Sequence, residues 1–445
     1  PPPRRFGFWT GLFVVAASMI GAGVLTTSGY TLQTTGNPAA LLALWAVGGL
    51  MAVCGALTIA ELATALPHAG GDYIFAREGF GRGAGFVAGW ATFVVGFCGP
   101  TAVTAVIAVT YLTGPFTPYL PGWTAGWVVP AGATLLIAAV TLAHCLGQTE
   151  SGRFQVAVTV VTVGVLLAVG AGGLLFGSGN WGHLSAGHWP TASQWPALAT
   201  GLIYVSYSYA GWNGAGYIAG EIRDPARLLP RALVGGTLGV TALYLLVNAA
   251  YVYALDPADM MARSPEDPEV AKVAETAVAR LFGRGAANGF AAVVGLSLVA
   301  SASAYILTGP RVTFAMARDG LFPAVAGRLH PTRNVPVWAT LAQGTLAAAF
   351  VWVASFEELL GYTSVGLAAV SALVVASVFP LRRRKVLTAF RMPLYPLPPL
   401  LYLGLIVWTV ASQVIDPDKR TAALLSLGTV LAGVPLARLF LPRGT

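Results

Sequence analysis

The sequence contains very little charge and few side chains that carry chemistry. Only 9% of its 445 residues are charged, against about a quarter in soluble globular domains. It has three cysteines and five histidines, whose spacing fits neither a metal site nor a disulfide framework. These shortages exclude an ordinary soluble enzyme. They also give little support to a membrane-embedded enzyme, which would need a metal cluster, paired carboxylates or an activated nucleophile.

Apolar residues are abundant instead, at 56% of the chain, and they form long runs without charge. A membrane-spanning helix needs about 20 apolar residues. Three runs, 6–60, 83–149 and 154–220, are each long enough for two helices joined by a turn. The sequence therefore predicts an all-α integral membrane protein with about twelve transmembrane helices. The six runs that fit one helix each are 232–255, 285–310, 334–356, 359–381, 392–415 and 421–437.

The basic residues are distributed unevenly over the predicted loops. With the N-terminus inside, six of the 25 basic residues fall on the outer face and the other 19 on the cytoplasmic face. Because basic loops mark the cytoplasmic side, we expect a multi-pass protein of the cell (inner or plasma) membrane with both termini cytoplasmic. The net charge of +8 is then a topology signal, and no nucleic-acid partner is predicted. The six outer residues are Arg263, Lys272, Arg280, Arg284, Lys419 and Arg420.

Glycine clusters interrupt the first and the sixth predicted spans. The first contains Gly21-Ala22-Gly23, and the sixth contains Gly211 with Gly214 and Gly216. Either cluster alone is also explained by close packing of helices through small residues. Five spans separate the two, however, which is where an inverted five-helix repeat would place paired broken helices at the bilayer midplane. Unwound backbone there offers N–H groups to a carboxylate and carbonyls to an ammonium, as a zwitterionic amino acid requires.

Three blocks of the sequence have a recognisable order and spacing. The first runs from Gly21-Ala22-Gly23-Val24 to Gly70-Gly71-Asp72-Tyr73, and the second joins Tyr209-Ala210-Gly211-Trp212-Asn213 to Glu221-Ile222-Arg223-Asp224-Pro225. The third is Gly309-Pro310-Arg311-Val312 with the downstream Arg318-Asp319-Gly320. Together they resemble the amino acid–polyamine–organocation (APC) transporters, the second block being similar to the L-type amino acid exchanger branch. The resemblance covers about the first three quarters of the chain.

The resemblance implies a particular domain organisation. We expect a LeuT-like core over residues 1–392, with inverted repeats at about 6–176 and 192–381, followed by two additional transmembrane helices in 393–445. It also implies alternating access to a central amino-acid site and gives Tyr207 the place of an aromatic gate, although an interfacial or packing role is the alternative. The substrate-binding residues predicted are Ile20, Gly21, Ala22, Gly23, Cys98, Tyr207, Ser208, Ala210, Gly211, Trp212 and Asn213.

One departure from the family concerns a positive charge. In many members the fifth span carries a Lys whose ammonium occupies the place of a sodium ion, and here that position falls on Thr162. Buried oxygens left unpaired by its absence would cost about 1–3 kcal/mol each. Sodium, a water molecule or repacking could fill the gap, and Thr and Ser also bond their own helix backbone. The predicted cation or cation-equivalent site is Ala17, Ile20, Thr162, Ser301 and Ser303.

The function predicted is secondary active transport of small neutral amino acids by alternating access, with Na⁺ coupling as one option. The predicted side-chain pocket contains no acidic residue that would specifically hold a cationic substrate. The alternatives are an amino acid exchanger or exporter, proton-linked or uncoupled, including one for cationic amino acids. A channel or a receptor is a weaker alternative, because paired broken helices favour a carrier. We expect no enzyme activity, no cofactor other than Na⁺, and no obligatory protein partner.

Overall fold

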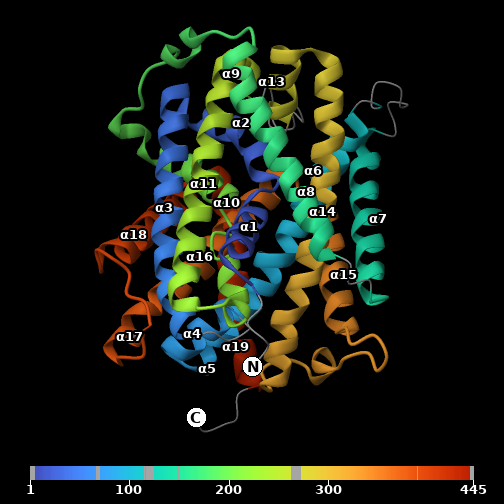
Figure 1. Cartoon of the computed structure of the whole chain (residues 1–445), viewed down its shortest axis with the longest axis vertical. Coiled ribbons are helices and arrows are strands. Elements are labelled where there is room, and N and C mark those ends of the chain that lie inside the picture. Colours follow the sequence, from blue (N-terminus) through green and yellow to red (C-terminus); the bar gives the residue numbers. More distant parts are fainter. Residues whose placement is uncertain are drawn as a thin grey trace.

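The protein is a bundle in which most helices lie side by side and run roughly along the long axis of the molecule (Figure 1). The computed structural model describes residues 6–66, 71–114, 116, 125–147, 151–261, 272–387 and 389–440. These residues form helices and connecting turns, and their extended pairing is limited to an isolated bridge between Phe6 and Ile222. In this part of the chain nine helices are long and apolar enough to cross a membrane, and a bent pair makes a tenth span.

The first six spans contain several irregular helices. Span one is the bent pair α1 (Phe8–Met19) and α2 (Gly23–Thr35), and span six is α10 (Trp195–Ser208) with the 3₁₀ helix η7 (Gly214–Glu221). Span three contains a π-helix, η1 (Thr92–Cys98), and span five contains another, η4 (Ala168–Gly172). The remaining helices here are α3 (Pro38–Ala65), α5 (Arg82–Ala91), α6 (Gly99–Thr113), α7 (Ala125–Cys145), α8 (Ser151–Leu167) and α9 (Gly173–Phe176).

The later spans are more regular. They are α11 (Pro225–Ala254), α14 (Arg284–Arg318), the shorter α15 (Val337–Val353), α16 (Phe356–Ala376), α18 (Leu397–Ile415) and α19 (Pro417–Phe440). The sequence predicts about twelve spans, and the described residues reach that number if the short α15 and the broken α10–η7 are added to the ten long apolar spans. Between spans lie α4 (Asp72–Phe80), η5 (Trp181–Ser185), η6 (Ala192–Gln194), α12 (Pro257–Met260), α13 (Val273–Phe282), η9 (Ala324–Gly327) and α17 (Val378–Arg383).

Many spans pack against the span five places further along the chain. The helix α2 lies against α10, α3 against α11, α6 against α14, and α7 against α15. An inverted five-plus-five repeat predicts this pairing, because each helix of one half then meets its counterpart from the other. The exact repeat boundaries and the separation at residue 392 stay predictions.

The two ends of the bundle carry different connecting segments. Figure 1 places α4, α5 and α17 at the lower end and α9 and α13 at the upper end. This agrees with the predicted assignment of Arg77, Arg82 and Arg382 to one face and of Arg280 to the other. The chain is therefore a multi-pass membrane protein, as expected. That the lower end faces the cytoplasm stays a prediction, and the terminal segments 1–5 and 441–445 lie outside the described residues.

Both predicted helix breaks are present. In span one, Ile20 is extended (φ −78°, ψ 101°), and α1 and α2 meet at an angle of 47°. In span six, turn residues separate α10 from η7, and Gly211 has φ 102°. A Cβ on Gly211 would also overlap the carbonyl oxygen of Ser18 in α1. Glycine is required at 211 both for its backbone conformation and for the close approach of the two broken helices.

Candidate functional site

A large cavity lies between the two helix breaks. Its volume is about 960 Å³, within the range of pockets that enclose small organic molecules. The breaks, η1, α14 and α16 form its wall, and it extends to Arg77, Arg318 and Asp319 at the lower end of the bundle. Arg318 and Asp319 are exposed. The cavity therefore opens at the end that the charge pattern predicts to be cytoplasmic.

Backbone groups of the first break face this cavity. Gly21, Ala22 and Gly23 line it at the start of α2, where the first N–H groups of a helix have no intrahelical acceptor. The positive end of the helix dipole favours a carboxylate at this point. A Cβ on Gly21 would meet no atom within 4 Å, whereas one on Gly23 would lie 2.5 Å from the Cα of Ser208. Gly21 thus faces open space, and Gly23 packs against α10.

Hydrogen bonds join the two broken helices to each other and to span seven. The Tyr244 hydroxyl of α11 lies 2.7 Å from the carbonyl oxygen of Met19 and 3.2 Å from that of Ser208. The hydroxyls of Thr27 and Ser208 are 2.7 Å apart. The side chain of Ser208 therefore serves mainly to hold α2 and α10 together, although the residue lines the cavity.

The wall of the large cavity contains a buried carboxylate, although the sequence predicted a pocket without acidic residues. Asp72, at the start of α4, lines the cavity and is 8% exposed. Its Oδ1 accepts a hydrogen bond from Asn213 Nδ2 (3.2 Å), and its Oδ2 accepts one from the Tyr217 hydroxyl (3.0 Å). Burial raises the pKa of Asp72 to about 6, and these two hydrogen bonds lower it by less. Asn213, a predicted substrate-binding residue, thus has its side-chain amide bound to α4.

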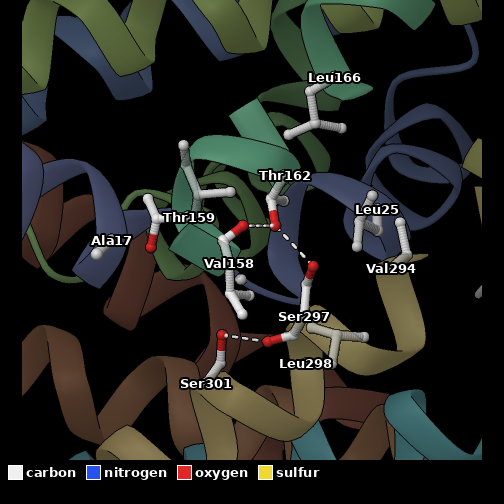
Figure 2. A pocket seen from close by; sticks show the side chains of 12 residues that line it. Ala17, Leu25, Val158, Thr159, Thr162, Leu166, Val294, Ser297, Leu298 and Ser301 are labelled. Atoms are coloured by element: carbon white, nitrogen blue, oxygen red, sulfur yellow. Dashed lines mark hydrogen bonds between the residues drawn. The ribbon is translucent and has the colours of Figure 1, made fainter. Parts of the chain in front are cut away.

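A second, small cavity lies beside the first break (Figure 2). Its volume is about 20 Å³, enough for one water-sized occupant. Thr162 Oγ1 lies 2.8 Å from the Val158 carbonyl oxygen and 2.6 Å from Ser297 Oγ, and Ser301 Oγ donates to the Ser297 carbonyl at 3.1 Å. Ala17 also lines this cavity. Thr162, the position at which the resemblance implies a Lys in other members, is thus paired with a hydroxyl of span eight.

Most of the predicted site residues lie at these two cavities. Ile20 lines the small cavity and not the large one, and Ala17, Gly21 and Ser301 line both. Thr162 lines the small cavity. The predicted residues on the wall of the large cavity are Ala17, Gly21, Ala22, Gly23, Tyr207, Ser208, Ala210, Gly211, Trp212, Asn213 and Ser301.

Two predicted residues, Cys98 and Ser303, line neither cavity. Cys98 ends the π-helix η1 and is completely buried, and it is not among the residues that line either cavity. Ser303 lies two residues after Ser301, and two residues turn a helix by about 200°. Its hydroxyl is accordingly directed to His144 Nε2 of α7, at 2.9 Å. Ser297, which the cation-site prediction omitted, lines the small cavity, and its four-residue spacing from Ser301 was the available signal.

A site lined by backbone groups between paired broken spans, in a cavity that opens at one end, is typical of membrane carriers. In agreement, the amino acid permease family model matches residues 6–433. The chain belongs to this amino acid permease (APC) family, and it is a transporter of amino acids rather than an enzyme.

Individual relatives agree with this assignment. The chain is 26% identical over 441 residues to the serine/threonine exchanger SteT of Bacillus subtilis, covering 97% of this chain and 96% of the relative. It is 28% identical over 374 residues to the Asc-type amino acid transporter 1 of Mus musculus, covering 81% and 67%. It is 29% identical over 349 residues to the large neutral amino acids transporter small subunit 2 of Homo sapiens, covering 76% and 62%.

Proposed function

We propose that this protein carries small neutral amino acids across the cell membrane by alternating access, with both termini cytoplasmic. The observation that carries the proposal is the stretch of uncharged wall that residues 21–23 and 207–211 of the two breaks give the large cavity. There the backbone amides of Ala22 and Gly23 would donate to the substrate carboxylate, and the small residues Ala210 and Ser301 would face its side chain. The charged residues that line the cavity come from α4, α14 and the end of η7. The names of the three relatives, each of which refers to neutral or hydroxyl amino acids or to amino acid transport, support the same class.

Alternating access is supported by how the broken helices are held. The inner half of span six, η7, is bound to α4 through Asp72, whereas α10 is bound to α2 through Ser208. The two halves of the span therefore have separate anchors. A movement at the break would change access at one end of the cavity without disrupting the packing at the other. We assign this movement to the core defined by residues 1–392, with the last two spans as additions.

The small cavity is proposed as the cation or cation-equivalent site. Its donor set suits Na⁺, because sodium is a hard cation that prefers oxygen ligands. Thr162, Ser297 and Ser301 would hold the ion together with carbonyl groups at the C-terminal end of α1, where the helix dipole is negative. The hydroxyl protons are directed to backbone carbonyls or to the neighbouring hydroxyl, so oxygen lone pairs remain. Bound Na⁺ would supply the positive charge that the family's Lys supplies elsewhere.

Uptake by purified protein in liposomes tests both proposals. A panel of labelled amino acids is offered with an imposed sodium gradient, with a pH gradient, or with unlabelled substrate inside. We expect small neutral amino acids to be transported and cationic ones to be poor competitors. If no amino acid moves or binds under any condition, the transport proposal fails. Uptake that is unchanged when choline replaces sodium would remove the Na⁺ proposal alone.

Variants at one glycine sharpen the test of the substrate site. Gly21→Val adds a side chain where a Cβ meets no neighbour, so the protein should fold while substrate binding falls at least tenfold. Gly239→Val is the matched control, because Gly239 also has open space around it but lies on the exposed face of α11, away from both cavities. Equal loss in both variants would show that the effect is not specific to the site.

A further inference from the structure

The contact between α4 and the inner half of span six combines close packing with two side-chain hydrogen bonds. Tyr217 of η7 lies directly over the start of α4, where Gly71 has φ 46° and a Cβ on it would overlap the Tyr217 ring. The next residue, Asp72, receives the Tyr217 hydroxyl on one carboxylate oxygen and the Asn213 amide on the other. A glycine with positive φ, an aromatic ring and a buried carboxylate therefore form one tight junction.

No basic side chain on the same helix compensates the Asp72 charge. Arg77, one turn further along α4, is bound to Glu78 and to Asp319, at 2.9 and 2.7 Å. The neighbouring Tyr73 hydroxyl also donates to Asp319, at 2.6 Å. Both side chains are thus directed toward the lower end of α14.

The helices α5, α16 and α17 pack against α4. The acidic residues of α16, Glu357 and Glu358, lie in its first turn, and α14 contributes Arg311 and Arg318 to the wall of the large cavity. On α17, Arg382 is bound to Glu61 and Arg383 is exposed, while the following Arg384 donates to the Glu78 carbonyl. Arg82 of α5 donates to the Asp319 carbonyl. The titratable groups that α18 and η7 bring near Asp72 are Tyr402 and Tyr217, together with Glu221 at the end of η7, which lines the same cavity. The two hydrogen-bond donors that the structure gives Asp72 are neutral.

We propose that Asp72 is a proton-binding site whose protonation releases the inner half of span six from α4. The proton arrives from water in the large cavity, which Asp72 lines. The ionised carboxylate accepts two hydrogen bonds, from Asn213 and Tyr217. Once one oxygen carries a proton, that oxygen is a poor acceptor, so one of the two bonds is lost or weakened. The pH on the cavity side then sets how readily the inner end of the transport pathway moves.

The relevant pH range follows from the burial of the group. With a pKa of about 6, the ratio of carboxylate to carboxylic acid rises from about 1:10 at pH 5 to about 10:1 at pH 7. The inference rests on the proposed transport function, but it concerns gating and not the driving ion. It is therefore tested with the same pH on both sides of the membrane.

The first experiment measures substrate exchange in proteoliposomes between pH 5 and pH 8. We expect the wild-type exchange rate to change with a midpoint near pH 6, and Asp72→Asn to lose this dependence and keep the rate of the protonated protein. Tyr217→Phe removes a hydrogen bond that stabilises the carboxylate, so its midpoint should move to higher pH. The control Glu221→Gln removes a second carboxylate of the cavity and should keep the wild-type midpoint.

Several results would overturn the proposal. A flat wild-type profile would do so, and so would an unchanged midpoint in Asp72→Asn or Tyr217→Phe. Loss of the dependence in Glu221→Gln would assign the proton to another carboxylate. If amino acids are exchanged at every pH without any such dependence, the transport function stands and the Asp72 proposal fails.

A second experiment reports on the junction without any transport. Ala304→Cys and Thr308→Cys place thiols one turn apart on the cavity wall of α14, the first half-buried and the second exposed. The ratio of their labelling rates by an impermeant maleimide cancels the pH dependence of the thiol reaction itself. We expect this ratio to change with a midpoint near pH 6 and to be constant when Asp72→Asn is added. A constant ratio in the otherwise wild-type background contradicts the proposal, even if no substrate has been found.

Discussion

Replacing Arg382 with leucine should destabilise the protein more than replacing its partner Glu61. Glu61, near the lower end of α3, is completely buried, whereas the Arg382 side chain is 22% exposed. The guanidinium donates to both carboxylate oxygens, at 2.5 and 2.7 Å, and the Met392 backbone N–H adds a third hydrogen bond at 2.9 Å. The Arg382 guanidinium also lies 3.7 Å from the centre of the Tyr395 ring.

The expected magnitudes follow from what each substitution leaves behind. Arg382→Leu leaves a carboxylate with no access to water and one N–H partner, so it should cost about 3–5 kcal/mol of stability. Glu61→Leu leaves an arginine that can still reach water and stack on Tyr395, and an N–H group without its acceptor. Its cost should be nearer 1–3 kcal/mol. The double variant should resemble Glu61→Leu, because the orphaned charge is gone.

Thermal or denaturant unfolding of the purified protein in one detergent measures these differences. Lys419→Ala is the matched control, because its ion pair with Glu357 joins two side chains that are each more than a quarter exposed. Removing such a pair should cost about 0–1 kcal/mol. The reasoning is refuted if Glu61→Leu is as damaging as Arg382→Leu, if the double variant is worse than Arg382→Leu alone, or if all three match the control.

Three further predictions concern the breaks and the lower end. Gly211→Ala should abolish transport and lower the unfolding temperature, because the alanine would have a positive φ and its Cβ would overlap the α1 backbone. Gly239→Ala should do neither in the same two assays, because a Cβ on Gly239 meets no atom within 4 Å. Tyr244→Phe should lower the exchange rate at least tenfold while costing about 1–3 kcal/mol of stability, and wild-type exchange would contradict a role in joining the breaks. Arg77→Ala should change the free energy of unfolding by no more than about 1 kcal/mol, because the side chains of Arg77 and Asp319 are 29% and 41% exposed. A larger decrease in the free energy of unfolding would show that the pair is effectively buried.

Much of the fold could be predicted because the membrane imposes simple rules. Charge-free runs give the spans, and paired glycine clusters give the breaks, since unwound backbone is tolerated at membrane depth only around a cavity or a ligand. These features depend on local composition and on distance along the chain.

The errors arise where local sequence does not determine direction. A π-helix adds a residue to the turn, so the side chain at 98 could not be oriented from α-helical periodicity. Ser303 could have been excluded, because it lies on the opposite side of its helix from Ser297 and Ser301. Asp72 could not be placed, because its contact with Asn213 joins segments 141 residues apart. A residue in a loop motif became part of the cavity wall only through tertiary packing.

The Tyr244 hydroxyl has a mechanical consequence that follows from its having a single proton. The carbonyls of Met19 and Ser208 both lie within reach of that proton, at 2.7 and 3.2 Å. If the two broken helices separate during the proposed transport cycle, the proton would lose one acceptor and strengthen its bond to the other. The energy of separation is therefore smaller than that of breaking two independent hydrogen bonds. Tyr244 of span seven would therefore keep the two breaks aligned while adding little to the energy needed to move one relative to the other.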